Sequence, residues 1–142
     1  MKKEVIIEII SFLVAAMFLY TGIMKLREYD VFKWVISSSP LLHSVAPVVA
    51  RVVPILEVVV ALMLVIPATR VKGLYIAFAM MVAFTIYIAV LLTMASKLPC
   101  SCGGVLESMS WSQHLVFNIL VTLLLGLCLW FNKQIKKQSI AI

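Results

Sequence analysis

The chain alternates between long apolar stretches and short polar segments. Almost all side chains are apolar in four stretches, at residues 5–24, 48–66, 74–95 and 115–131. A helix of about 20 apolar residues is long enough to cross the hydrocarbon core of a bilayer. The pattern therefore predicts an all-α protein, a polytopic membrane four-helix bundle.

Two of the connecting segments are long enough to carry further structure. Residues 25–47 contain an apolar group at residues 31–36, followed by the Ser-Ser-Ser-Pro run at residues 37–40. This pattern predicts a short amphipathic helix that lies on the membrane interface and ends at the serines. Residues 96–113 form the second segment. No repeat or change in composition divides the chain, so we expect one transmembrane domain over residues 1–142.

Lys2 and Lys3 precede the first apolar run, as basic residues do in secretory signal peptides. The apolar region of a signal peptide has only about 7–15 residues and is followed by a cleavage site of small residues. The run at residues 5–24 is longer, and no clear site of that kind follows it. We therefore expect this segment to remain as a membrane helix.

Composition supports a membrane location. Of the 142 residues, 64% are hydrophobic and 13% are charged, and the mean hydropathy is +1.15. Soluble domains are closer to half apolar and one quarter charged, so much of the surface must face lipid. The net charge of +6 does not indicate nucleic-acid binding, because the basic residues flank the apolar runs, where they anchor and orient helices.

The distribution of these basic residues predicts the orientation. Seven basic residues fall on the side of the chain ends: Lys2, Lys3, Arg70, Lys72, Lys133, Lys136 and Lys137. Four fall on the other side: Lys25, Arg27, Lys33 and Lys97. Lysine and arginine are enriched in cytoplasmic loops. Both termini are therefore expected to be cytoplasmic, and the segment at residues 96–113 is expected to be extracytoplasmic.

That segment contains Cys100 and Cys102, followed by Gly103 and Gly104. Two thiols one residue apart can form a disulfide only in a tight turn, because an extended chain holds their Cα atoms near the upper limit of about 6.8 Å. So small a ring is strained, and a strained disulfide is readily reduced. The pattern favours a redox dithiol. A structural disulfide remains an alternative, although it would close almost no loop and add little stability.

A metal site is the other alternative for the cysteine pair. His114 is the only further ligand nearby, so this chain alone cannot complete a four-ligand zinc site, and we expect no metal. Cys128 lies about 21 Å beyond His114 along a helix, at about 1.5 Å per residue. It is expected to pack as a small apolar side chain.

Several polar residues lie within the predicted spans or directly at their ends, on the side of the cysteines: Lys25, Arg51, Glu57, His114 and Asn118. Ionisable groups inside a membrane are costly, and they usually face the bundle interior and pair with a partner. They could form a polar cluster that supports the cysteines. The structural alternatives are that Arg51 anchors lipid headgroups, that Glu57 holds Lys25 or Arg51, and that His114 caps a helix.

Three of these patterns together resemble a known family. The stretch Tyr20-Thr21-Gly22-Ile23-Met24-Lys25-Leu26 resembles the Gly-x-x-Lys-Leu signature of DoxX-like membrane proteins, and Pro54-Ile55-Leu56-Glu57 is similar to their second helix. The Pro99–Gly104 loop, followed by Trp111, His114 and Asn118, resembles the branch named for the methylamine utilisation protein MauE. The namesake motif continues Phe-Gly where this chain has Gly103-Gly104.

The resemblance covers roughly residues 5–130 and implies a function. The namesake acts with a thioredoxin-like partner in maturing a disulfide-rich periplasmic enzyme subunit. It implies that Cys100 and Cys102 exchange electrons with an extracytoplasmic thioredoxin-like protein, in a bacterial inner membrane. Such a protein would be a thiol–disulfide oxidoreductase, and a quinone is the natural electron carrier of the bilayer.

Two other functions are compatible with parts of the pattern. The chain could be a non-catalytic anchoring or assembly subunit, whose disulfide holds a loop against an extracytoplasmic partner. Transport of a small solute is disfavoured, because no pair of interrupted apolar helices is present.

Overall fold

The computed structural model describes residues 2–94 and 109–141, and every regular element within them is a helix. Four helices are long and apolar enough to cross a membrane. They are α1 (Lys2–Arg27), α3 (Ala46–Val65), α4 (Arg70–Met94) and α5 (Trp111–Ile140). A shorter helix, α2 (Tyr29–Ser37), and a 3₁₀ turn, η1 (His43–Val45), lie between α1 and α3. The prediction of an all-α, multi-pass membrane bundle is confirmed.

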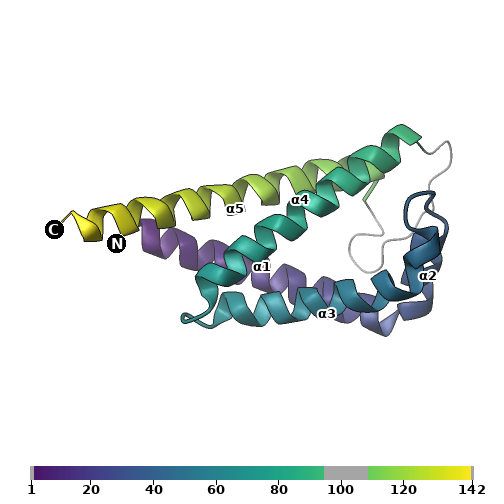
Figure 1. The fold of residues 1–142 in the computed structure, drawn as a ribbon, viewed down its shortest axis with the longest axis horizontal. Helices are drawn as coiled ribbons and strands as arrows, with labels where there is room; N and C mark the ends of the chain where they lie inside the picture. The colour runs from purple at the N-terminus through teal and green to yellow at the C-terminus, as the bar shows by residue number, and fades with distance from the viewer. Residues whose placement is uncertain (1, 95–108, 142) are drawn as a thin grey trace.

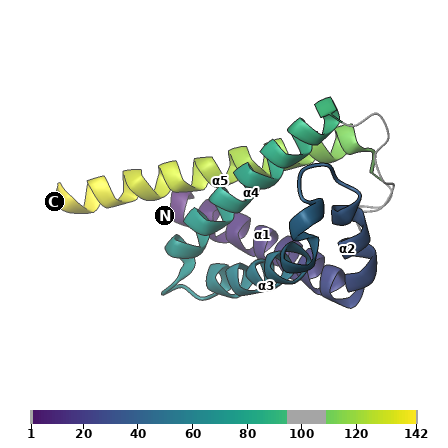
Figure 2. The same ribbon diagram turned by 45° about the vertical axis from the view of Figure 1, so that its right-hand side comes forward.

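Consecutive long helices run in opposite directions, so both chain ends lie at the same end of the bundle (Figure 1). We call this the terminal end; it also contains the turn between α3 and α4. The opposite end contains α2, the end of α4 and the start of α5, and we call it the α2 end (Figure 2). Most of the segment predicted at residues 96–113 lies outside the described residues. Which end faces the cytoplasm stays a prediction.

The helix α5 differs most from its predicted extent of residues 115–131. It begins at Trp111 because a capping box precedes it: the Ser110 hydroxyl accepts from the Gln113 N–H at 3.2 Å, and the Gln113 side chain accepts from the Ser110 N–H at 3.0 Å. It continues to Ile140 and projects past its neighbours (Figure 1). Its 30 residues span about 45 Å, more than the roughly 30 Å of a hydrocarbon core.

The outer surface of the bundle is apolar. Along α1, for example, the side chains of Val5, Ile9 and Leu13 are 53%, 53% and 66% exposed. A water-soluble bundle would place polar residues at such positions. Because no other part of the described chain covers these side chains, they are suited to contact lipid tails.

The core lies between all four long helices. Phe18 of α1, Leu64 of α3, Met81 of α4 and Leu125 of α5 are each at most 2% exposed and belong to one buried cluster. A second, smaller cluster joins Ile36 at the end of α2 to the start of α3. The short helix predicted around residues 31–36 is therefore present, and it folds back onto α3.

Candidate functional site

Glycine at position 22 allows α1 and α3 to approach closely near the α2 end. A Cβ atom added at Gly22 would lie 2.9 Å from the Pro54 carbonyl oxygen and 3.0 Å from Val58 Cγ2. Real Cβ atoms essentially never come within 3.0 Å of another heavy atom in this way, so only glycine fits here. In a helix, residues three apart share a face. The contact between Gly22 and Pro54 therefore also brings together Lys25 and Glu57.

Lys25 and Glu57 form an ion pair across this contact. The Lys25 Nζ lies 2.7 Å from Glu57 Oε1, and the Glu57 side chain is only 2% exposed. This distance is typical of a charge-assisted hydrogen bond between an ammonium and a carboxylate. The sequence left open whether Glu57 holds Lys25 or Arg51, and the structure pairs it with Lys25.

The second oxygen of the same carboxylate is unused. Glu57 Oε2 is buried and has no hydrogen-bond partner among the residues that the structure describes. The Thr21 hydroxyl lies close enough to interact with this carboxylate, but it donates its hydrogen bond to the Phe18 carbonyl at 3.3 Å. The site therefore has a negatively charged acceptor in a region with few polar neighbours.

Lys25 contacts elements from across the bundle. Its Nζ lies 5.3 Å from the ring centre of Phe32 in α2 and 5.5 Å from that of Phe84 in α4. Both distances fall within the range of cation–π attraction. Lys25 thus joins α1 to α2, α3 and α4, and neither phenylalanine was anticipated from the sequence.

Arg51 does not join this cluster. It is exposed, and its guanidinium lies 5.4 Å from the ring centre of Tyr29 at the start of α2. Arg51 and Glu57 are six positions apart, which at about 100° per residue places them on different faces of α3. Arg51 therefore ties α2 to α3.

His114 and Asn118 lie on α5, one turn apart. His114 is half-buried and stacks on Trp111, with ring centres 6.3 Å apart. The helix cap is formed by Ser110 and Gln113, so the His114 side chain is not needed for capping. The Asn118 side chain is buried, at 4% exposed. The backbone carbonyl of Asn118 accepts a hydrogen bond from the Thr122 hydroxyl at 2.7 Å. Polar groups thus continue from the α2 end into the middle of α5.

Cys100 and Cys102 lie outside the described residues. The end of α4 and the start of α5, between which these cysteines fall in the sequence, lie at the α2 end (Figure 1). Cys128 is fully buried in the core, as expected for a packing residue.

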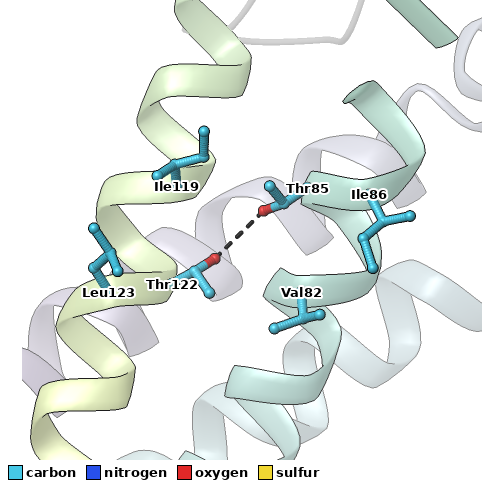
Figure 3. A pocket seen from close by; sticks show the side chains of 6 residues that line it. All are labelled: Val82, Thr85, Ile86, Ile119, Thr122 and Leu123. Atoms are coloured by element: carbon cyan, nitrogen blue, oxygen red, sulfur yellow. Dashed lines mark hydrogen bonds between the residues drawn. The ribbon is translucent and has the colours of Figure 1, made fainter. Parts of the chain in front are cut away.

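A groove of about 230 Å³ opens between α4 and α5 (Figure 3). Its lining is almost entirely apolar, and Thr85 and Thr122 face each other across it, with their hydroxyl oxygens 3.4 Å apart. Each hydroxyl also donates to a carbonyl of its own helix, at 2.6 Å for Thr85 and 2.7 Å for Thr122. Because its lining is almost entirely apolar, the groove has the character of a lipid-facing surface.

A second ion pair lies toward the terminal end. Arg70 Nη2 is 3.4 Å from Glu8 Oε1, and the Glu8 side chain is 51% exposed. Arg70 also donates to the Leu64 carbonyl at 3.0 Å and to the Val65 carbonyl at 3.3 Å. It therefore closes the turn between α3 and α4 as well as contacting α1.

Comparison with known proteins identifies one family. The family model of the methylamine utilisation protein MauE matches residues 3–131, which include all four long helices in whole or in part. A search of curated proteins and a search of solved structures found no match.

Proposed function

The chain belongs to the MauE family of multi-pass membrane proteins, and from this premise we propose that it is a membrane thiol–disulfide redox protein. Cys100 and Cys102 exchange electrons with an extracytoplasmic thioredoxin-like partner, in the maturation of disulfide-containing proteins. The observation that supports the proposal is the buried ion pair between Lys25, two residues before the end of α1, and Glu57, in the middle of α3.

The chemistry proceeds by thiol–disulfide exchange. A thiolate of one protein attacks a disulfide sulfur of the other and forms a mixed disulfide, which the second cysteine of the pair resolves. A nearby positive charge favours the thiolate that this step requires. The candidate cations are Lys25, whose charge is partly offset by Glu57, and the exposed Arg51.

The electrons need a carrier within the bilayer. Oxidation of the two thiols to a disulfide releases two electrons and two protons. A quinone takes up both and becomes a hydroquinone, so it balances the reaction, and the reverse reaction reduces the disulfide. We therefore include a membrane quinone in the proposal as the electron carrier.

The proposal requires the α2 end to be extracytoplasmic, with both termini in the cytoplasm of a bacterial cell. After mild reduction of intact cells, a membrane-impermeant thiol reagent should label Cys100 or Cys102. Cys128, which is buried, should not react. Labelling that occurs only after the inner membrane is broken would show that the orientation is inverted.

Trapping of the partner tests the exchange reaction. Replacing the resolving cysteine by Ser should leave the mixed disulfide unresolved, so a complex with a thioredoxin-like protein should accumulate in Cys100→Ser or Cys102→Ser. Non-reducing electrophoresis of native membranes, followed by mass spectrometry, would detect it. The double Ser variant is the control and should trap nothing.

The alternative function predicts a different result. If neither single variant captures a thioredoxin-like protein, and the double variant still supports the partner's activity, the oxidoreductase proposal fails. The chain would then act as a non-catalytic anchoring or assembly subunit, because such a subunit needs no thiol chemistry.

A further inference from the structure

The unused oxygen of Glu57 defines the kind of ligand that this site can hold. A carboxylate accepts hydrogen bonds at both oxygens and donates none. Lys25 occupies Oε1 at 2.7 Å, whereas Oε2 is buried and has no partner within the described ranges 2–94 and 109–141. A buried polar atom without a partner is costly. The Thr21 hydroxyl is close by, and a ligand that pairs with the ionised Oε2 in its place would have to donate a hydrogen bond.

The residues around the Lys25–Glu57 pair further limit the class of ligand that could bind there. Lys25 Nζ has three hydrogens, of which Glu57 takes one, and its other neighbours include the rings of Phe32 and Phe84. The pair lies within helices that are long and apolar enough to span the membrane. A ligand that reaches it from the bilayer would be lipid-soluble, carry a hydroxyl donor for Oε2, and present a second oxygen or a ring to Lys25 and its aromatic neighbours.

We propose that the Lys25–Glu57 pair binds a membrane hydroquinone, and binds it more tightly than the corresponding quinone. A hydroquinone has hydroxyl groups that can donate to Glu57 Oε2, whereas a quinone has only acceptor oxygens and would leave Oε2 unpaired. This inference rests on the proposed function for its choice of a quinone. It adds the residues that bind and the oxidation state that they prefer.

The preference has a consequence for the direction of electron flow. Tighter binding of the reduced form makes the bound couple a stronger oxidant, and each tenfold difference in affinity raises its two-electron potential by about 30 mV. The site therefore favours the reaction in which the dithiol of Cys100 and Cys102 becomes a disulfide and the quinone takes up two electrons and two protons. This preference acts on the bound couple, and the net direction of electron flow is set by the potentials of the free partner protein and the quinone pool.

Binding can be measured without any thiol chemistry. In the Cys100→Ser/Cys102→Ser protein no redox reaction with the pair is possible, so both oxidation states can be added separately. The probes are a short-chain benzoquinone whose ring is fully substituted, which prevents attack by thiols, and its hydroquinone under anaerobic conditions. Equilibrium dialysis in detergent, checked by the shift in thermal unfolding, would give the two dissociation constants. The hydroquinone should bind about tenfold more tightly or better, because hydrogen bonds to charged groups are the strong class.

Two variants test whether Glu57 causes the preference for hydroquinone over quinone. Glu57→Gln offers both a donor and an acceptor, so the ratio of the two dissociation constants should fall to near one. Glu8→Gln is the matched control, because Glu8 is also an ion-paired carboxylate on a spanning helix, and its ratio should equal that of the parent protein. Unfolding curves recorded without ligand show which variants are folded.

Each result of these binding measurements either supports or overturns the proposal. A hydroquinone preference that is lost in Glu57→Gln and kept in Glu8→Gln supports the site. Equal affinities in the parent protein, or no binding of either form, overturn it, and the parent measurement decides alone if Glu57→Gln does not fold. An unchanged preference in folded Glu57→Gln also overturns it. Failure of partner trapping, by contrast, would leave these binding constants unaffected, so the two proposals can fail separately.

Discussion

The Lys25–Glu57 pair connects α1 to α3 and the Glu8–Arg70 pair connects α1 to α4, one near each end of α1, and they differ in how much depends on them. Glu57, in the middle of α3, is 2% exposed and is the ion-pair partner of Lys25, at 2.7 Å. Toward the terminal end, Glu8 is 51% exposed and lies 3.4 Å from Arg70, which is also bonded to two backbone carbonyls. Removing Glu8 leaves Arg70 with partners. Removing Glu57 leaves a largely buried ammonium without its carboxylate.

The largest effect is therefore expected for Glu57→Ala. Breaking a buried ion pair from one side typically costs about 3–5 kcal/mol, because the remaining charge stays buried without compensation. Cys128 is fully buried and can report unfolding in the Cys100→Ser/Cys102→Ser protein, since its thiol should react only when the bundle opens. Its labelling in detergent across a denaturant series would measure the loss.

Glu57→Gln serves as the comparison for this variant. The Gln side chain can still accept a hydrogen bond from Lys25, although it removes the charge, so its loss of stability should be smaller than that of Glu57→Ala. Equal stability of Glu57→Ala and the parent protein would show that the pair does not hold the bundle together.

An intermediate effect is expected for Gly22→Ala. The added methyl group would meet the Pro54 carbonyl oxygen at 2.9 Å, and a backbone atom cannot move aside as a flexible side chain can. Overpacking of this kind costs about 1–3 kcal/mol. The same Cys128 labelling measures it, and the two changes should be non-additive with Glu57→Ala, because separating α1 from α3 already weakens the ion pair.

Gly126→Ala is the matched control for Gly22. The nearest atom to its added Cβ would be Phe78 Cε2 at 3.5 Å, an ordinary contact. Alanine is also the better helix former by about 0.5–1 kcal/mol. Gly126→Ala should therefore be neutral or slightly stabilising, and an equal cost at both glycines would refute the close contact at Gly22.

The sequence offered two partners for Glu57, Lys25 and Arg51, and did not choose between them. Gly22 and Lys25 are three apart on one helix, and Pro54 and Glu57 are three apart on another, so each motif places its two residues on one helix face, but the sequence does not show that the two faces meet. Arg51 was an equally good partner by composition. Helical geometry places it on another face of α3, and only the packing of α2 shows that it lies beside Tyr29.

The hydropathy pattern could not predict where the helices end or which aromatic residues lie beside Lys25. An apolar run marks the part of a helix that contacts hydrocarbon, whereas α5 begins at a capping box formed by polar residues. Phe84 sits in an apolar run with nothing to distinguish it. Its role depends on how α4 crosses α1, which is a property of tertiary packing. Which residue lies opposite another across two helices is therefore the information that the structure adds.

The smallest effect is expected for Glu8→Ala, and it tests the comparison from the other side. Exposed ion pairs contribute about 0–1 kcal/mol, and Arg70 keeps its hydrogen bonds to the Leu64 and Val65 carbonyls and its contact with the Phe12 ring at 5.7 Å. The stability of Glu8→Ala, measured by Cys128 labelling beside that of Glu57→Ala, should thus lie close to that of the parent protein. A loss as large as that of Glu57→Ala would mean that Arg70 depends on Glu8 despite its backbone bonds. The two pairs would then be equivalent structural ties, and the spare oxygen of Glu57 would be the one remaining difference between them.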